Sequence, residues 1–317
     1  MTTTAMDVAR DSDLSGQTVL ITGGTSGLGI ETAKALAEAG ADLVLTGRNM
    51  DAGQAVIHTL SECGEGRHRL VALDLADPAD IARFASELCD EIGRIDVLIA
   101  NAGIAQTPQD RLANGLELRF ATNYLGHFLL VHELWPLLAA RGSRLVLLGS
   151  AGHKGRATTI GDLSWERREI DQRVAYGESK AAISLFAVEA TRRWHASGIF
   201  ANCVLPGSVV TGLQRHHTPE RMQEMLKIGE SGAGGSVFTT PQQGAATSVW
   251  AAIAPELESV GGLVLEDCGL SRIAGRETHP FKGYELHSTD SQRARELYDA
   301  TVALIAARGI PFPNAAP

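Results

Sequence analysis

Short apolar runs alternate with longer segments of helical spacing along most of this chain, and this alternation restricts the fold more than any other feature. Strands that alternate with helices pair in parallel, because each helix carries the chain back across the sheet. The returning helices cover both faces of that sheet. The pattern therefore predicts an α/β fold with a doubly wound parallel sheet of about seven strands and helices on both faces.

The expected strands are Thr18–Ile21, Leu43–Thr46, Leu70–Leu73, Val97–Ala100, Leu145–Leu148, Phe200–Leu205 and Leu263–Leu265. The expected helices cover about 28–39, 50–61, 77–91, 110–140, 173–196, 241–254 and 290–307. We expect the fourth of them to break near Asn123 or Pro136. Asp77 followed by Pro78 is typical of a helix start, and Gly40 and Gly198 stand where glycine ends a helix.

One domain is the simplest organisation, because the alternation runs to about residue 265 without a repeat or a Pro/Ser-rich linker. A chain of 317 residues is long enough to bury a sizeable core. We interpret 1–15 as a polar N-terminal tail and 16–270 as the domain that carries the ligand site. Residues 271–317 form a C-terminal extension with a final helix.

Charge and composition exclude several classes of protein. The formal net charge of -9 argues against nucleic acid as a partner. No apolar stretch approaches the roughly 18 residues of a membrane-spanning helix, and the first residues lack the apolar core of a signal peptide, so we expect a cytoplasmic protein without a membrane partner. The cysteines are too far apart for a zinc knuckle or a disulfide scaffold, and we expect them to be reduced and mostly buried. They are Cys63, Cys89, Cys203 and Cys268.

A glycine-rich turn, Thr22 to Gly29, lies directly after the first expected strand and opens the first expected helix. Glycines allow backbone N–H groups to approach a pyrophosphate closely, and the helix N-terminus adds positive potential. An ordinary tight turn is the alternative. The residues expected to contact a dinucleotide here are Gly23, Thr25, Ser26, Gly27, Leu28 and Gly29.

Arg48 follows the second expected strand, where a dinucleotide fold reads the adenosine ribose. An acidic residue there would bond to a free 2′-hydroxyl and repel a 2′-phosphate, whereas a guanidinium pairs with that phosphate. The sequence therefore favours NADP, with NAD possible. An arginine that only faces solvent is the alternative.

Tyr176 and Lys180 lie four residues apart at the start of an expected helix, which places both side chains on one face. A tyrosine is ordinarily a poor acid–base catalyst at neutral pH, because the pKa of its phenol is about 10. A nearby ammonium favours the phenolate, so Lys180 gives a reason to choose Tyr176. Taken alone, an ordinary helical pair is the better interpretation.

Taken together, these motifs and several polar positions after successive strands make the chain resemble the short-chain dehydrogenase/reductases in their compact single-domain, Rossmann-type form. The resemblance covers about residues 16–270. Ser150 to His153 and the long insert with Asp162 and Leu163 before Tyr176 are most similar to the retinol dehydrogenase branch and its bacterial relatives. The loop from Leu213 to Phe238 is more polar than a retinoid channel suggests. The matching positions, in family order, are Thr22 to Gly29, Asp74 and Leu75, Asn101 to Gly103, Asn123, Ser150, Tyr176, Lys180, Pro206, Gly207 and Thr211.

The resemblance implies hydride transfer between a nicotinamide cofactor and a small alcohol, aldehyde or ketone, with Tyr176 as general acid and base. The implied catalytic residues are Asn123, Ser150, Tyr176 and Lys180: Ser150 bonds the substrate oxygen, Lys180 holds the nicotinamide ribose, and Asn123 positions a water. The implied cofactor contacts further along the chain are Asp74 and Leu75 at the adenine, Asn101, Ala102 and Gly103 beside the cofactor, and Pro206, Gly207, Val209 and Thr211 near the nicotinamide.

The resemblance also implies a substrate lid over 209–240 and a homodimer or homotetramer. Three other interpretations exist. Gly177 to Ala181 superficially matches a serine-hydrolase elbow but opens a helix and lacks its second glycine. His216 and His217 have no partner at zinc-like spacing, so we expect no metal. A cofactor-sensing regulator without turnover is the non-enzyme alternative.

Overall fold

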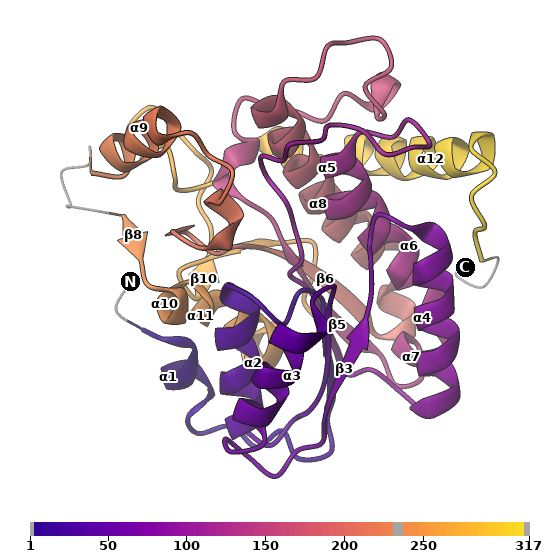
Figure 1. Ribbon diagram of the computed structural model, residues 1–317, viewed down its shortest axis with the longest axis vertical. Coiled ribbons are helices and arrows are strands. Elements are labelled where there is room, and N and C mark those ends of the chain that lie inside the picture. The colour runs from indigo at the N-terminus through magenta and orange to yellow at the C-terminus, as the bar shows by residue number, and fades with distance from the viewer. Residues whose placement is uncertain (1–2, 231–236, 314–317) are drawn as a thin grey trace.

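The computed structural model describes residues 3–230 and 237–313 and contains one central sheet between two layers of helices (Figure 1). The sheet has eight strands in the order β10-β9-β6-β5-β4-β1-β2-β3. Its strands are β1 (Thr18–Ile21), β2 (Asp42–Gly47), β3 (His68–Ala72), β4 (Val97–Ala100), β5 (Ser143–Leu148), β6 (Ile199–Leu205), β9 (Val264–Glu266) and β10 (Gly269–Leu270). The predicted doubly wound α/β fold is confirmed.

The sheet has one strand more than the about seven expected, namely β10. This strand pairs antiparallel with β9, and every other pair in the sheet is parallel. Asp267 and Cys268 form the connection, each with a positive φ, of 52° and 55°. Two left-handed residues match the twist of a two-residue hairpin. Cysteine is not a usual residue at such a turn, so the sequence carried little signal for it.

Six of the seven expected helices start within one residue of the expected position, whereas the helix expected over 110–140 differs and the helices Ala5–Ala9 and Pro219–Glu230 were not expected. The helices are α1 (Ala5–Ala9), α2 (Leu28–Glu38), α3 (Met50–Leu60), α4 (Pro78–Glu91), α5 (Leu118–Phe120), α6 (Gly126–Glu133), α7 (Trp135–Leu138), α8 (Gln172–Trp194), α9 (Pro219–Glu230), α10 (Pro241–Gly244), α11 (Ala246–Ile253) and α12 (Ser291–Ala307). Asp77 caps α4 with a bond from the Ala79 N–H, and Gly198 ends the α8 region with φ 73°. Both caps agree with the sequence.

The helix expected over 110–140 is shorter and broken. It starts only at Leu118, and residues Ala121–Leu125 form a π-helical turn, η1, between α5 and α6. A second break separates α6 from α7, whose second residue is Pro136. Both expected break positions are therefore present, because the π turn contains Asn123 and the missing N–H of Pro136 interrupts the helical bonding.

The first residues differ from the polar tail that we expected, although residues 1–2 lie outside the described part. Thr4 and Asp7 form a capping box that starts α1. Ala5, Ala9 and Leu14 are buried, and α1 packs on α11 and α2. The short apolar side chains allow close packing, and this contact depends on residues more than 200 positions away. A local pattern does not reveal such a contact.

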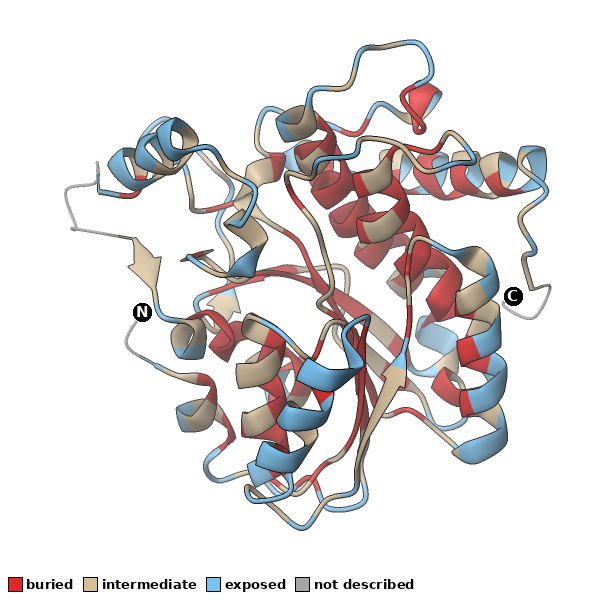
Figure 2. Cartoon of the chain, viewed as in Figure 1, coloured by how far each residue is buried: buried red, intermediate tan, exposed pale blue. Residues whose placement is uncertain are grey.

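Two apolar layers, one on each face of the sheet, make the core (Figure 2). Leu36 of α2 and Val249 of α11 pack on one face, while Phe84 of α4, Phe128 of α6 and Trp194 of α8 pack on the other. Strand β1 pairs with β2 on one side and β4 on the other, so the chain reverses its winding direction there. The carboxyl ends of strands at such a point form the usual crevice for a ligand in open α/β sheets.

The C-terminal extension lies on the body of the fold rather than beside it. Helix α12 packs against α8, and the Tyr298 hydroxyl lies 2.9 Å from His132 Nε2 on α6. Phe312 stacks on Phe128 with ring centroids 5.8 Å apart. No helix of the described residues is long and apolar enough to span a bilayer. All four cysteines are free, but only Cys203 is buried, so the expectation of mostly buried thiols is wrong.

The free energy of unfolding should fall as the pH is lowered from about 6.5 to about 4. Burial lowers the pKa of His127, His132 and His153 to about 4 each. Each Nδ1–H faces a backbone carbonyl, so in the neutral ring each Nε2 accepts a bond, from the hydroxyl of Thr22 or Tyr298 or from the Glu285 N–H. The unfolded chain binds these protons in that window and the folded chain does not, which costs about 3 kcal/mol per histidine at pH 4.

Urea unfolding at several pH values tests this prediction. His132→Gln retains a donor and an acceptor but cannot titrate, so its free energy of unfolding should depend less steeply on pH than that of the parent. His58→Gln changes an exposed histidine of α3 and serves as the matched control. If the free energy of unfolding of the parent did not change between pH 6.5 and 4.5, the assignment of neutral, buried imidazoles would be wrong.

Candidate active site

Two adjoining cavities open at the carboxyl edge of the sheet. The turn cavity, of about 270 Å³, lies over the glycine turn after β1. The large cavity, of about 940 Å³, lies between α8, α9 and the segment 274–285. The two cavities share the lining residues Leu28, Gly149, Tyr176, Pro206, Thr211 and Leu213. A molecule in one cavity therefore meets a molecule in the other at Tyr176.

The glycine turn leaves space that side chains would fill. A Cβ on Gly29 would lie 2.4 Å from the Gly23 carbonyl oxygen, and Gly23 and Gly27 have φ of 63° and 53°. Asn101 Nδ2 holds the turn by donating to the carbonyls of Thr22, at 2.8 Å, and Gly23, at 3.1 Å. Helix α2 begins at Leu28, so its N-terminus points its free N–H groups at this space. These features fit a dinucleotide pyrophosphate.

Fifteen of the predicted site residues line the turn cavity. They are Gly23, Thr25, Ser26, Gly27, Leu28, Arg48, Asp74, Leu75, Asn101, Ala102, Gly103, Tyr176, Lys180, Pro206 and Thr211. Ser150, Gly207 and Val209 line the large cavity instead, and Gly29 is in neither lining. Asn123 lines neither cavity among the described residues.

Arg48 is exposed at the end of β2 and lines the turn cavity. Its neighbour Gly47 has no side chain because a Cβ there would lie 2.4 Å from Thr25 Oγ1. Arg215, on the short turn after β7 (Ser208–Val209), lines the same cavity. The sequence analysis missed Arg215, since no motif places that loop over the glycine turn.

Tyr176 lies in the second turn of α8, which Asp171 caps by accepting from the N–H groups of Arg173 and Val174. Ser150 follows β5, and its hydroxyl accepts from the Gly152 N–H at 3.1 Å. Burial raises the pKa of Tyr176, and a hydrogen bond with Ser150 opposes that shift. The phenol therefore stays protonated at neutral pH and can donate to a substrate oxygen.

Lys180 is buried on the same face of α8, four residues after Tyr176. Its Nζ donates to the Leu148 carbonyl at 2.7 Å and lies 5.9 Å from the centre of the Tyr176 ring. Burial lowers the pKa of Lys180 to about 8. The ammonium therefore carries most of its charge at pH 7, close to the phenol.

Asn123 lies beneath this pair in the π turn. Its Oδ1 accepts from the Ile104 N–H at 2.8 Å, and its Nδ2 donates to Ser179 Oγ at 2.9 Å. Ser179 in turn donates to the Tyr176 carbonyl at 2.7 Å. A Cβ on Gly103 would lie 3.3 Å from Lys180 Nζ and 3.4 Å from Asn123 Oδ1. The structure thus places Asn123 near the ammonium, with Ser179 as a link that the sequence analysis missed.

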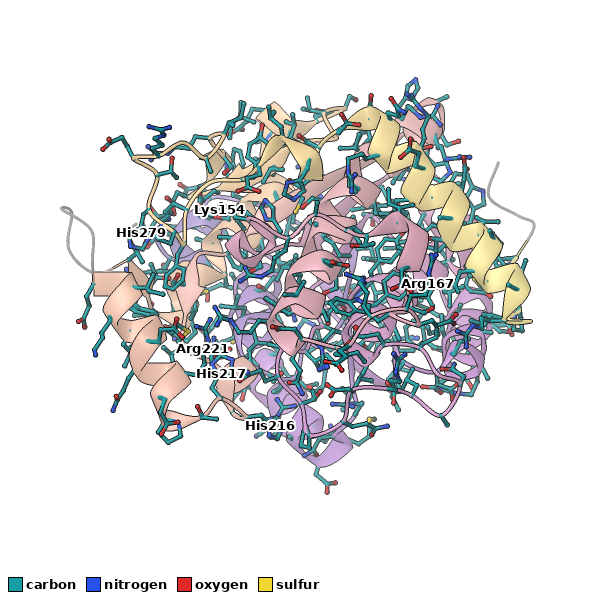
Figure 3. The ribbon with its side chains drawn as sticks, turned by 90° about the horizontal axis from the view of Figure 1, so that it is seen from above. Lys154, Arg167, His216, His217, Arg221 and His279 are labelled. Carbon is teal, nitrogen blue, oxygen red and sulfur yellow. The ribbon has the colours of Figure 1, made fainter. Side chains whose placement is uncertain are left out.

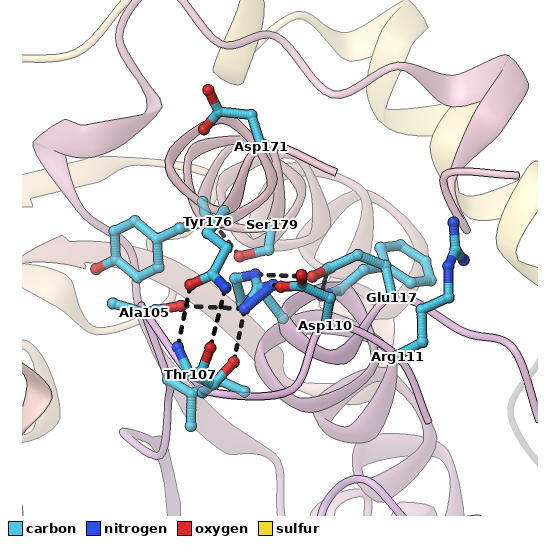
Figure 4. A network of polar contacts seen from close by, with 12 residues as sticks. Ala105, Thr107, Asp110, Arg111, Glu117, Asp171, Tyr176 and Ser179 are labelled. Carbon is cyan, nitrogen blue, oxygen red and sulfur yellow. Dashed lines mark hydrogen bonds and ion pairs between the residues drawn. The ribbon is translucent and has the colours of Figure 1, made fainter. Parts of the chain in front are cut away.

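A buried ion-pair network fixes the loop that precedes α5 (Figure 4). Arg119 and Glu117 are fully buried, with Nε and Oε1 2.7 Å apart, and Arg119 also contacts Asp110. Arg119 Nη1 donates to Thr107 Oγ1 at 2.7 Å, and Thr107 exchanges two backbone hydrogen bonds with the Gln172 amide at the start of α8. This network holds the loop against the helix that carries Tyr176.

The C-terminal segment forms one wall of the large cavity, which the sequence analysis did not predict. His153 is buried behind Ser150: its Nδ1 donates to the Ser150 carbonyl at 2.6 Å, and its Nε2 accepts from the Glu285 N–H at 3.2 Å. Lys154 Nζ donates to the His279 carbonyl at 3.0 Å. These bonds tie the segment after Ser150 to residues 274–285.

The comparisons with known proteins place this site in a family. The family described as short chain dehydrogenase matches residues 17–222. The chain belongs to the short-chain dehydrogenase family. It is 42% identical over 302 residues to a Streptomyces antibioticus protein named "Probable oxidoreductase", covering 93% of this chain and 100% of that one. It is 34% identical to human "Retinol dehydrogenase 13" over 318 residues, 94% of this chain and 86% of that one.

Solved structures agree with this assignment. A protein from Mycobacterium paratuberculosis superposes with a TM-score of 0.70 at 27% identity, covering 96% of this chain and 98% of that one. The Pseudomonas aeruginosa RhlG/NADP active-site complex has a TM-score of 0.64 at 25% identity, with 80% and 95% covered. The chain is therefore a short-chain dehydrogenase of the retinol dehydrogenase-like branch. It is an NAD(P)-dependent oxidoreductase that uses a nicotinamide cofactor.

Proposed function

We propose that this short-chain dehydrogenase transfers a hydride between NADP and the carbonyl or alcohol group of a small molecule bound in the large cavity. The observation that carries the proposal is the position of Tyr176, which lines both cavities beside Ser150 and above Lys180. A bound nicotinamide cofactor supplies or accepts the hydride. The protein must then deliver a proton to the substrate oxygen, or remove one, at the point where the cavities meet.

Tyr176 is proposed as that proton donor in reduction and acceptor in oxidation. Its half-buried phenol is protonated before reduction, and the Lys180 ammonium, 5.9 Å from the ring centre, would stabilise the phenolate that remains afterwards. Ser150 would bond the same substrate oxygen and hold it at the phenol. Asn123 would position a water that connects Lys180 to solvent, although its amide already has protein partners on both sides.

The turn cavity is proposed to hold the cofactor, with Lys180 at the nicotinamide ribose and Asp74 and Leu75 at the adenine. The segment 209–240 is proposed as the lid over the substrate. It contains α9 and β8 (Phe238–Thr239) and begins in β7, with which β8 pairs, while 231–236 lie outside the described residues. We also propose, from the family resemblance, that the protein forms a homodimer or homotetramer.

Steady consumption of NADPH with a panel of aldehydes and ketones tests the activity. The presence of Ser150, Tyr176 and Lys180 around the opening shared by the cavities favours an enzyme over a redox sensor. A protein that binds NADPH tightly but turns over no aldehyde or ketone, and oxidises no alcohol with NADP⁺, would favour the sensor.

Arg48 should select NADP over NAD. A charge-assisted contact with a 2′-phosphate stabilises binding by typically about 1.5–3 kcal/mol, so the parent should prefer NADPH by tenfold or more. Arg48→Asp should reverse that preference, because a carboxylate repels the phosphate and accepts from a ribose hydroxyl. The measurement is kcat/KM for NADPH and NADH in the parent and the variant.

Arg141→Asp is the matched control for this substitution. Arg141 is also exposed, but it precedes β5 and so lies at the opposite, amino edge of the sheet. Its replacement makes the same change in net charge and should leave the NADPH-to-NADH ratio unmoved. A parent that prefers NADH would show that Arg48 does not read the cofactor.

A further inference from the structure

The large cavity is strongly basic in a protein whose net charge is -9. Among the described residues, its lining includes five cationic side chains and one carboxylate, Glu285. The cationic residues are Lys154, Arg156, Arg173, Arg221 and Arg276. A concave site lined by one sign of charge concentrates potential of that sign. The cavity is therefore suited to an anion, unlike the protein surface as a whole.

Arg156 lies against the helix that carries Tyr176. A Cβ on Gly177, the residue after Tyr176, would lie 2.3 Å from Arg156 Cδ, so the arginine stem rests on the helix beside the phenol. Its Nη1 donates to the carbonyls of Gly152, at 3.0 Å, and Lys154, at 3.4 Å. Within the described residues, Nε and Nη2 have no hydrogen-bond acceptor. Nη1 is thus held by backbone carbonyls, and the N–H groups of Nε and Nη2 can donate to a bound ligand.

Two more arginines line the same cavity from different helices. Arg173 lies three residues before Tyr176 on α8, and Arg221 lies on α9 next to His217 (Figure 3). Burial lowers the pKa of Arg156, and the charges of Arg173 and Arg221 lower it further, whereas Asp171 opposes them. The positive charges of Arg173 and Arg221 therefore act on the Arg156 guanidinium, and all three residues line the large cavity.

Few carboxylates compensate this cluster. Arg221 pairs with Glu224 at 2.6 Å, but in the described part of the chain neither Arg156 nor Arg173 forms an ion pair. Lys154 is engaged by backbone carbonyls of the C-terminal wall and has a structural role there. Like charges held together repel one another, and a bound anion removes that repulsion while accepting paired N–H bonds from a guanidinium.

We propose that the large cavity takes a carbonyl or alcohol compound that also carries an anionic oxygen group, a carboxylate or a phosphate, held by Arg156 with Arg173 and Arg221. This inference rests on the proposed reaction at Tyr176 and adds the substrate class. A volume of about 940 Å³ leaves room for a long spacer between the reacting carbon and the anion. Unlike a neutral lipid alcohol, the substrate would carry a charged group at the end far from the reacting carbon.

Matched pairs of substrates test the proposal. The probes are ω-oxo alkanoic acids of increasing chain length with the methyl ester of each acid, and an ω-oxo alkyl phosphate with its dimethyl ester for the second anion. With NADPH and the full-length protein, kcat/KM for the best acid or phosphate should exceed that of its neutral counterpart by roughly ten- to a hundredfold, the usual strength of bonds to charged groups. The better of the two anions identifies the group.

Arg156→Gln should reduce the acid-to-ester ratio of kcat/KM by about tenfold or more, mainly through KM. Arg167→Gln is the matched control, because Arg167 is an exposed arginine of the insert that lies away from Arg221 and outside the cavity lining (Figure 3). Its ratio should equal that of the parent. Calorimetric titration of the NADP-loaded protein with the corresponding dicarboxylic acids and their dimethyl esters gives a second measure that needs no turnover.

Failure of this inference is distinct from failure of the proposed reaction. Esters reduced as well as acids, with a ratio that Arg156→Gln does not change, would overturn the anionic substrate while leaving hydride transfer at Tyr176 intact. Dicarboxylates that bind in an Arg156-dependent way without any oxo compound being reduced would support the anion site and overturn the reductase. Equal binding of diacid and diester would overturn the anion site irrespective of turnover.

Discussion

Tyr176→Phe is expected to lower kcat by roughly 10²–10⁴-fold, the range typical of general acid–base catalysis. The substitution removes the proton donor but keeps the ring that lines both cavities. Cofactor affinity should stay close to that of the parent, because the Lys180 ammonium and the glycine turn are untouched. The measurements are kcat with the best aldehyde of the panel and Kd for NADPH by fluorescence titration.

Tyr284→Phe is the control for the loss of a phenolic hydroxyl. Tyr284 is half-buried in the C-terminal segment and lines neither cavity. Its variant should turn over like the parent. If Tyr176→Phe retained more than roughly a tenth of the parental kcat, the proton transfer would have to come from another group.

Gly29→Ala should weaken cofactor binding by roughly ten- to a hundredfold, the usual strength of a hydrogen bond to a charged group such as the pyrophosphate. The new Cβ would lie 2.4 Å from the Gly23 carbonyl oxygen and 2.8 Å from Asn101 Nδ2, so the turn must open. Helix α2 itself should tolerate the change, because alanine is the better helix former by about 1 kcal/mol. The defect is thus expected in Kd for NADPH, and thermal unfolding without cofactor should change much less.

Gly93→Ala is the matched control, because a Cβ on Gly93 has no atom within 4 Å. It should bind NADPH like the parent. If Gly29→Ala left the Kd for NADPH unchanged, the turn would have to accommodate the new Cβ without moving the groups that bind the cofactor.

Features that depend on neighbouring residues were predictable from the sequence. The run before Thr22, the cap at Asp77 and the left-handed end at Gly198 each follow from local chemistry, and the structure has all three. Tyr176 and Lys180 share a face because four residues make about one helical turn. The family resemblance then supplied Ser150 and Asn123, which local spacing alone does not single out.

Features that depend on tertiary contact were not predictable. Arg215 reaches the turn cavity only because its loop folds over the glycine turn, and Glu285 reaches His153 only because the last segment crosses the site. Arg156 was not singled out because an arginine in a polar insert has no local signal. Its place beside Gly177 emerges only when the insert packs on α8.

The π turn at Ala121–Leu125 has a consequence for insertions and deletions in this region. Such a turn contains one residue more than an α-helical turn, and each residue rotates a helix by about 100°. Deletion of one residue here could still give a continuous helix, yet it would swing Asn123 away from Ser179 if Phe128 kept its place in the core. A deletion that leaves the helix continuous would therefore still turn the Asn123 side chain away from the surroundings of Lys180.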